Sequence, residues 1–538
     1  MSDTVDTVTH APPPTHEEPD PKRWLALAVI AVAQLMVILD SSIVNIALPS
    51  AQKALHISNA DRQWMVTAYT LSFGSLLLLG GRIADYAGRK RIFVIGLLGF
   101  AGASALGGLA VNAPMLFGAR ALQGAFGALL APAALSLITV TFTEVKERST
   151  AFGVYGAIAG GGAAIGLILG GVLTQYASWR WCLFVNVPIA VVTALAALPI
   201  VRESRAHGNT SYDIPGTATV TGGLVSLVYG FTLAAQDGWT SANTLTFLGI
   251  AAVLLVAFVV IEVKSANPLL PMRILLERNR GGSYLSALMV GSGLLGMFLF
   301  LTYYFQSVLG YSALKAGFAF LPFSAGIILA AGVASKLLPR FGPRFMMVGG
   351  FGAAALGLLW LSRITPSTSY LAHVLPAELL MSLGMGTAFV PMSSTALYRV
   401  DPHDAGVASA TLNTSQQIGG SLGTALLNTL AASATVTYIA THAHTPSNAV
   451  AAQVHGYSVG FLVGAGFLVV AALSAFFLVN ATKEDLADVG GVSGAVIVAS
   501  VRPGPSAPAC ATPSPRPVAG SLRVGPPEGA AGAGQKPV

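Results

Sequence analysis

The sequence predicts an all-α integral membrane protein. Of its 538 residues, 54% are hydrophobic and only 9% are charged, whereas soluble domains carry about 25% charged residues. The apolar residues form runs of about 18 to 26, which is long enough for helices that cross a bilayer. These runs lack the alternating polarity of barrel strands, and backbone hydrogen bonding in lipid then requires helices.

We expect about fourteen transmembrane helices. In chain order the apolar runs lie at residues 24–48, 64–82, 92–110, 115–140, 151–174, 181–201, 214–234, 244–262, 281–306, 315–335, 345–362, 371–396, 406–431 and 456–480. The Gly- and Ser-rich run at 406–431 has the weakest hydropathy signal.

The runs divide into two six-helix halves with a helix pair inserted between them. The predicted parts are an N-terminal tail at 1–21, a first half at 22–201, the inserted pair with its linkers at 202–280, a second half at 281–480 and a tail at 481–538. Both tails are expected to be disordered, because the first is polar and the second is rich in Pro, Gly and Ala.

Basic residues indicate the orientation. The loops on one side carry Arg82, Arg89, Lys90, Arg91, Lys146, Arg148, Arg202, Arg205, Lys264, Arg273, Arg278, Arg280, Lys336, Arg340, Arg344 and Arg399. The loops on the other side carry only Lys53, Arg62, Arg180, Lys315 and Arg363. This bias predicts that both termini are cytoplasmic, and it explains the net charge of +7 as topology rather than as a nucleic-acid-binding face. The acidic, Pro-containing start does not resemble a signal peptide, so the first helix is expected to be retained.

An internal repeat links two of the basic loops. GRIADYAGRKR begins at Gly81 and SKLLPRFGPRF begins at Ser335, so that Gly88 aligns with Gly342. Repeated halves are typical of secondary transporters, whose sites lie near the middle of the membrane between the halves. In the second copy Pro339 replaces Asp85.

Asp40 is the acid that the first apolar run contains, within LDSSIVNIALP. An Asp at the centre of a spanning helix costs about 2.5–3.5 kcal/mol, so such an acid usually faces the protein interior and marks an ion or substrate path. The alternative is a side chain that only reaches the membrane interface.

Arg120 is the strong cation expected inside a helix of the first half. It shares a face with Gln123, Gly124 and Gly127, and it lies at a depth similar to that of Asp40. Burial favours a neutral carboxyl group and a nearby cation favours a charged one, so a movable Arg120 would couple protonation of Asp40 to conformation. A static ion pair, or an arginine bonded to carbonyl groups, is the alternative.

Two glycine-containing motifs carry a family resemblance. The loop GGRIADYAGRKR resembles the signature loop of the major facilitator superfamily, and the residues it assigns to a conformational switch are Gly81, Arg82, Asp85, Gly88, Arg89 and Lys90. Asp85 would pair with basic groups or a helix N-terminus of the other half. The run GAAIGLILGG resembles the antiporter motif of the same superfamily through Gly162, Gly166, Gly170 and Gly171. It departs from that motif at Leu167, where a proline is usual. A plain basic loop and ordinary small-residue packing are the alternatives.

Together with SWRWCLFVNVP, YFQSVLGYSALKAGFAFLP and GVASATLNTSQQIGGSLGTAL, these motifs resemble the fourteen-helix drug/proton antiporter branch. The resemblance implies efflux of an amphipathic organic compound, a drug or antibiotic, across the plasma membrane in exchange for protons. Asp40 would carry the proton, with Arg120 as its conformational partner. The proton gradient would replace any cofactor, and no ATP-binding or cysteine metal motif is present. The expected partners are the substrate, protons and the lipid bilayer, without nucleic acid, and a monomer is compatible with the sequence.

Polar and aromatic residues inside the helices are candidates for the substrate cavity. They are Gln34, Ser41, Asn45, Gln123, Tyr303, Gln306, Glu378, Asn413 and Gln417. Three other functions stay open: a nutrient symporter or uniporter, a sensor without transport, and a membrane-embedded transferase. The transferase is disfavoured because the helices lack a cluster of acids, histidines or nucleophiles.

Overall fold

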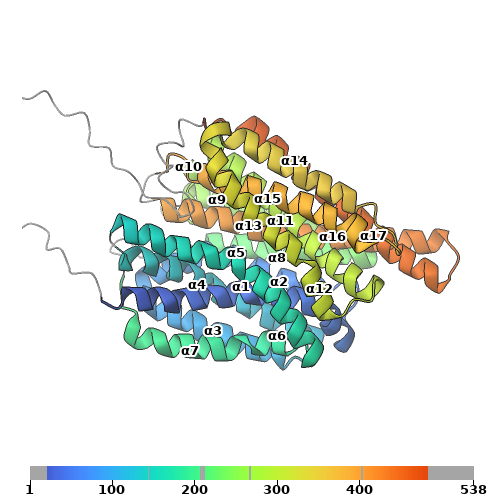
Figure 1. Cartoon of the computed structure of the whole chain (residues 1–538), viewed down its shortest axis with the longest axis horizontal. Helices are drawn as coiled ribbons and strands as arrows, with labels where there is room; N and C mark the ends of the chain where they lie inside the picture. Colours follow the sequence, from blue (N-terminus) through green and yellow to red (C-terminus); the bar gives the residue numbers. More distant parts are fainter. Residues whose placement is uncertain (1–20, 143, 206–212, 266–267, 401–403, 483–538) are drawn as a thin grey trace, which may run out of the picture. The chain divides into compact units, whose positions relative to one another are not determined.

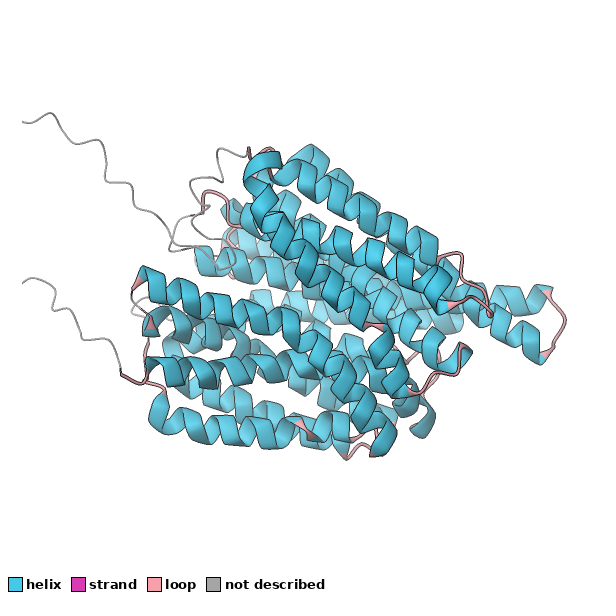
Figure 2. Cartoon of the chain, viewed as in Figure 1, coloured by secondary structure: helices cyan, strands magenta, loops and turns pink. Residues whose placement is uncertain are grey.

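The described part of the chain is helical, and no strand occurs in it (Figure 2). The computed structural model describes residues 21–142, 144–205, 213–265, 268–400 and 404–482. These residues all belong to one compact unit. The predicted tails lie almost entirely outside the described ranges. The predicted all-α class is confirmed.

The first half contains the six predicted helices, the sixth of them broken near Val185. Their bounds are α1 (Arg23–Ala54), α2 (Trp64–Ala87), α3 (Arg89–Gly108), α4 (Ala113–Thr141), α5 (Val145–Tyr176), α6 (Trp181–Phe184) and α7 (Asn186–Ile200). Helix α4 begins where the Asn112 side chain accepts a hydrogen bond from the Met115 backbone N–H at 2.9 Å. That cap satisfies one of the free donors at the helix start.

The rest of the chain supplies the middle pair and the second half. The middle segment contains α8 (Ile214–Asp237), α9 (Ala242–Lys264) and the short α10 (Met272–Leu275). The second half contains α11 (Arg278–Tyr303), η1 (Tyr304–Val308), α12 (Ala313–Ala319), α13 (Leu321–Phe341), α14 (Pro343–Leu361), η2 (Tyr370–Val374), α15 (Leu375–Ala396), α16 (Ala405–Thr441) and α17 (Pro446–Leu478). Figure 1 shows their arrangement along the chain.

Every predicted apolar run coincides with a helix. Within the described residues, 13 helical segments are long and apolar enough to cross a membrane. The remaining run is α5, of which only Gly161–Tyr176 is strongly apolar. The largest differences are at α16 and α17, which extend to Thr441 and start at Pro446, well beyond the predicted ends at 431 and 456. The added helical residues, 432–441 and 446–455, are mostly small or polar. The hydropathy signal therefore ends before each helix does.

The two halves repeat the same pattern of helix pairs. In the first half α1 packs on α5, α2 on α4, α3 on α4 and α3 on α7. In the second half α11 packs on α16, α13 on α15, α14 on α15 and α14 on α17. The contacts between halves are related in the same way, since α2 packs on α16 and α5 on α12 and α13. This pairing is what an internal repeat predicts.

The aligned glycines of the two loops have corresponding conformations. Gly88 ends α2 with a φ of 114°, and Gly342 ends α13 with a φ of 74°. Residues with a Cβ atom rarely adopt such values, so each loop depends on its glycine to turn directly into the next helix. The repeat seen in the sequence therefore extends to the backbone of both loops.

The pair formed by α8 and α9 contacts both halves. Helix α8 packs on α2 and on α16. The Thr232 hydroxyl accepts hydrogen bonds from Gln63 Nε2 and Trp64 Nε1, each at 3.0 Å. The Phe231 carbonyl oxygen accepts one from the Thr429 hydroxyl at 2.8 Å. These contacts are compatible with an inserted pair, and the domain boundaries themselves stay a prediction.

Several direct hydrogen bonds join the two halves at one end of the bundle. We call this the distal end, where α1 ends and α2 begins; α1 begins at the proximal end. Gln306 Nε2 donates to the Ile46 carbonyl oxygen at 2.9 Å, and the Leu314 N–H donates to Gln175 Oε1 at 3.3 Å. In this conformation the halves are thus joined at the distal end.

Candidate functional site

Asp40 lies on α1 with no exposed surface. Its Oδ2 atom accepts a hydrogen bond from Arg120 Nη1 at 2.7 Å. Its Oδ1 atom accepts from Gln123 Nε2 at 3.0 Å and from Asn186 Nδ2 at 2.8 Å. The structure thus brings together the acid and the cation that were predicted at similar depths, and it surrounds the carboxylate with three N–H donors.

Arg120 is fixed on α4 by more than its ion pair. It is 2% exposed, its Nε atom donates to the Met65 carbonyl oxygen at 3.1 Å, and its Nη1 atom also donates to Gln123 Oε1 at 2.7 Å. The guanidinium carbon lies 4.5 Å from the centre of the Tyr69 ring. A buried cation needs such partners, since desolvation of a charge costs several kcal/mol.

Asn186 is a member of this network that sequence reasoning missed. It begins α7 and is fully buried. Its amide nitrogen bonds Asp40, while its Oδ1 atom has no hydrogen-bond partner within the described part of the chain. Ser104 is a second missed member, because its hydroxyl accepts from Gln123 Nε2 at 2.5 Å. The available signal was a polar residue inside a strongly apolar run.

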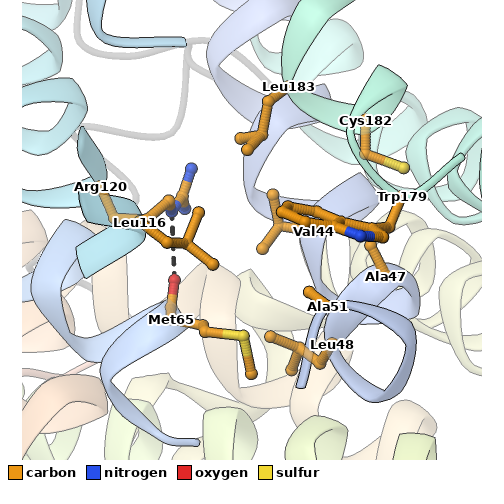
Figure 3. Close-up of a pocket in the computed structure, with 10 residues that line it drawn as sticks. All are labelled: Val44, Ala47, Leu48, Ala51, Met65, Leu116, Arg120, Trp179, Cys182 and Leu183. Carbon is orange, nitrogen blue, oxygen red and sulfur yellow. Dashed lines mark hydrogen bonds between the residues drawn. The ribbon is translucent and has the colours of Figure 1, made fainter. Parts of the chain in front are cut away.

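A small cavity lies beside Arg120, toward the distal end (Figure 3). Its volume is about 20 Å³, which is enough for one water molecule. Figure 3 shows the Arg120 guanidinium at one side of this space and the hydrogen bond to the Met65 carbonyl group. Apart from Arg120 the lining is apolar and consists of Val44, Ala47, Leu48, Ala51, Met65, Leu116, Trp179, Cys182 and Leu183.

The glycines of α5 allow close contact with α1 and α12. A Cβ atom on Gly162 would lie 3.0 Å from Ile38, one on Gly166 would lie 2.6 Å from Ser42 Cβ, and one on Gly170 would lie 2.8 Å from the Ile43 carbonyl oxygen. Gly171 faces the other half, where a Cβ atom would lie 2.6 Å from Leu314 Cα. Three of the four predicted glycines thus set the distance between α5 and the helix that carries Asp40.

The predicted switch loop lies at the proximal end. Asp85 forms an ion pair with Arg89 at 2.8 Å, four residues further along the chain. The Arg82 side chain donates to the Pro268 carbonyl oxygen, and Lys90 Nζ donates to the Leu198 carbonyl oxygen at 2.5 Å. The Asp85 partner observed in this conformation therefore belongs to its own half, whereas we expected a group of the other half.

One acidic residue and two glycines complete this loop. Glu203 accepts hydrogen bonds from the backbone N–H groups of Lys90 and Arg91, both at 3.1 Å, and so caps α3. A Cβ atom on Gly88 would approach Glu203 Oε1 to 2.9 Å, and one on Gly81 would lie 3.5 Å from Pro132. Glu203 was not predicted, since it lies far along the sequence, in the linker that follows the predicted first half.

The predicted substrate-cavity residues do not form one cluster. Gln123 belongs to the Asp40 network, and Glu378 is fully buried. Tyr303 is 3% exposed and lies under Arg62, whose guanidinium carbon is 4.3 Å from the ring centre. Gln306 bonds the other half at the distal end. In this conformation each of these four side chains is buried or is already in contact with another part of the protein.

The other five candidates retain polar groups at partly or fully exposed positions. Ser41 and Asn413 are exposed, and Gln34, Asn45 and Gln417 are partly exposed. Gln34 Oε1 accepts a hydrogen bond from the Tyr155 hydroxyl at 2.7 Å. Their part in substrate binding stays a prediction.

Comparison with known proteins gives consistent matches. The family model described as Major Facilitator Superfamily matches residues 30–424. The puromycin resistance protein pur8 of Streptomyces alboniger is 49% identical over 88% of this chain and 95% of its own length. The cephamycin export protein CmcT of Amycolatopsis lactamdurans is 38% identical over 76% of this chain and 85% of its own.

A solved structure of similar fold is a bacterial homologue of the human lysosomal transporter Spinster. It superposes with a TM-score of 0.62 at 17% sequence identity, over 87% of this chain and 98% of that one. At this identity the match concerns the fold alone.

Proposed function

The chain belongs to the major facilitator superfamily, and from this premise we propose that it exports an amphipathic, antibiotic-like compound in exchange for protons. As a member of this family it is a multi-pass membrane transporter and not an enzyme. The relatives named for resistance to puromycin and export of cephamycin support an antibiotic as substrate. Puromycin is the first compound to test, given the 49% identity to the puromycin resistance protein.

The observation that carries the proton coupling is the buried contact between Asp40 and Arg120, at 2.7 Å. Three N–H donors converge on the two carboxylate oxygens, an arrangement that suits the deprotonated acid. Protonation would remove the charge that Arg120 faces and place an O–H group among N–H donors. The pair would then separate, and α1 and α4 would shift relative to each other.

Close packing of α5 against α1 supports the same proposal. Because Gly166 and Gly170 bring these helices together beside Asp40, little space is left there for a continuous file of water. A protein that exchanges protons for a compound needs such a barrier, because protons would otherwise cross the membrane without transport of the compound. The distal contacts between halves complete it in this conformation, with the distal end facing outside and both termini in the cytoplasm.

The proton gradient supplies enough energy for this exchange. One proton that enters across about 100 mV releases about 2.3 kcal/mol, and one pH unit adds about 1.4 kcal/mol. Together these terms sustain a several-hundredfold gradient of a neutral compound.

The test is puromycin-dependent proton movement in proteoliposomes with an imposed pH gradient. We expect puromycin to move protons through the intact protein, and we expect Asp40→Asn to reduce the rate at least tenfold. The matched control is Asp237→Asn, because Asp237 is exposed at the end of α8. Folding is checked by gel filtration and thermal melting. Wild-type rates in Asp40→Asn would refute the role of Asp40.

The same vesicles separate export from nutrient uptake. An antiporter moves the compound and the protons in opposite directions, whereas a symporter moves them in the same direction. Co-directional movement would replace our proposal by the symporter function.

A further inference from the structure

The second half contains a buried acid that the proposed mechanism does not use. Glu378 lies in the first turn of α15 and has no exposed surface. Neither of its carboxyl oxygens has a hydrogen-bond partner within the described residues. An unpaired carboxylate in such a place would be far too costly, so the group must be a neutral carboxylic acid in this conformation.

The internal repeat shows which residue of the first half corresponds to Glu378. The spacing along the chain that relates Gly88 to Gly342 also relates Ser72 on α2 to Gly326 on α13. These two positions face equivalent helices, since α2 packs on α4 and α13 packs on α15. They therefore serve as a reference for aligning α4 with α15.

Helices α4 and α15 align through the residues that contact this reference. Gly124 on α4 packs against Ser72. In the same way, Ser382 on α15 packs against Gly326, which corresponds to Ser72. Arg120 lies one helical turn before Gly124, and Glu378 lies one turn before Ser382. The repeat thus places Glu378 where the first half has Arg120.

The environment of that position differs between the halves. Helix α11, the counterpart of α1, carries no charged residue between Gly281 and Tyr303. The neighbours along the chain, Val374 at the end of η2 and Met381 and Met385 on α15, are all fully buried. Within the described residues, the second half therefore buries an acid at the equivalent place without supplying a countercharge on α11 or beside it on α15.

No cation among the described residues is placed to neutralise Glu378. Tyr370, which interacts electrostatically with it, donates its hydroxyl to the Ala319 carbonyl oxygen at 2.8 Å instead. The other charged and titratable groups on the helices packed around α15 are Arg278, Arg280, Tyr284, Tyr303 and Tyr304 on α11 and η1, Lys336 and Arg340 on α13, Arg344 on α14, His373 on η2 and Tyr438 on α16. Both ring nitrogens of His373 are hydrogen-bonded to Trp360, at 3.3 and 3.1 Å. The arginines and the lysine of this set all lie at the proximal ends of their helices, whereas Glu378 lies near the distal end of α15.

We propose that Glu378 is a second exchangeable proton site, in the half of the molecule opposite Asp40. In the conformation described here its carboxylic acid holds one proton. When the packing around α15 loosens and water reaches the group, the O–H bond breaks, the proton passes to water and a carboxylate remains. A site for a cationic compound would require the carboxyl group to line a cavity, and Glu378 has no exposed surface.

The first test does not depend on transport. Purified protein at neutral pH should show the infrared C=O band of a buried protonated carboxylic acid, and Glu378→Gln should lose it. Glu378→Met, with a flexible apolar side chain of similar length, is a second variant that should also fold and lack the band. Glu147→Gln is the control and should leave the band unchanged, because Glu147 forms an ion pair with Arg23 at 2.8 Å and is thus held as a carboxylate. Retention of the full band in both Glu378 variants would overturn the proposal.

The second test rests on the proposed export function. It measures how many protons move for each puromycin molecule transported in vesicles. We expect Glu378→Gln to carry one proton fewer per cycle, so that the puromycin gradient sustained at about 100 mV falls about 50-fold. An unchanged count would overturn the role of Glu378. If puromycin is not transported at all, the export function fails for this compound, and the infrared result decides independently whether Glu378 is protonated. Loss of puromycin binding with an unchanged proton count would make Glu378 a binding residue and also refute the proposal.

Discussion

The two halves place an ionisable residue at equivalent positions and stabilise it in opposite ways. Arg120 in the first half is buried with an ion pair, an amide, a carbonyl oxygen and an aromatic ring around it. Glu378 in the second half is buried among apolar side chains, with no hydrogen-bond partner in the described chain. An arginine cannot lose its charge in a protein, so it needs partners, whereas a glutamate can bind a proton instead.

The largest expected difference is between replacement of the ionisable residue in the first half and replacement of its counterpart in the second half. Arg120→Met leaves Asp40 buried without its cation, and loss of one partner of a buried ion pair costs about 3–5 kcal/mol. Glu378→Met removes no hydrogen bond within the described residues, so we expect little loss or a small gain in stability. Thermal melting in detergent measures both. Equal losses would show that Glu378 has a partner in the folded protein and would remove the contrast between the halves.

A smaller effect is expected for Asn186→Ala. This variant removes one N–H donor to the Asp40 carboxylate, and hydrogen bonds to charged groups contribute about 1.5–3 kcal/mol. Asn45→Ala is the control, since the Asn45 amide donates only to the Ser41 carbonyl oxygen of its own helix, at 3.0 Å. A melting temperature unchanged relative to wild type in Asn186→Ala would mean that the network does not need this donor.

The close packing of α1 and α5 can be tested with two glycines of one helix. Gly170→Ala places a Cβ atom 2.8 Å from the Ile43 carbonyl oxygen, and overpacking of this kind costs about 1–3 kcal/mol. Gly161→Ala has no atom within 4 Å of the new Cβ, and alanine favours the helix by up to about 1 kcal/mol. The melting temperatures should move in opposite directions. The same direction in both would mean that α5 is not held close to α1.

The smallest effect concerns the pair α8 and α9, which we predict to be an insertion between the two halves. Thr232→Val removes the acceptor for Gln63 and Trp64, and each neutral hydrogen bond contributes about 0.5–1.5 kcal/mol. Thr246→Val is matched to it, because the Thr246 hydroxyl donates only to the Ala242 carbonyl oxygen of its own helix. We expect a lower melting temperature for Thr232→Val than for Thr246→Val. No difference would show that these contacts do not attach the pair.

Hydropathy and spacing predicted most of the fold. Backbone hydrogen bonding in lipid leaves helices as the solution for long apolar runs, so the sequence locates the spans directly. The similar depths of Asp40 and Arg120 followed from counting residues to the helix ends. The ends of α16 and α17 were not predictable by hydropathy, because those turns are small and polar and extend past the apolar runs.

Side-chain partners were harder to predict than helices. Asn186 and Ser104 join the Asp40 network through the packing of α7 and α3, which one sequence does not specify. Tyr303 and Gln306 were expected at a cavity, yet α11 changes to the wider π-helix η1 at Tyr304. A π-helical turn rotates the residues that follow it relative to a regular α-helix, so the sequence alone does not give the direction of the Gln306 side chain.

Arg62 has a consequence for behaviour under acid conditions. Between α1 and α2 at the distal end, its guanidinium contacts Tyr303 and Tyr457 in the second half, and its Nε atom donates to Asn428 Oδ1 at 3.0 Å. Arginine, tyrosine and asparagine side chains keep the same charge from acid to neutral pH. In the proposed orientation this contact faces the more acidic solution, and acidification leaves it intact. This contact between the two halves is therefore expected to stay closed over the whole range of external pH, so acid outside the cell does not by itself open the distal end.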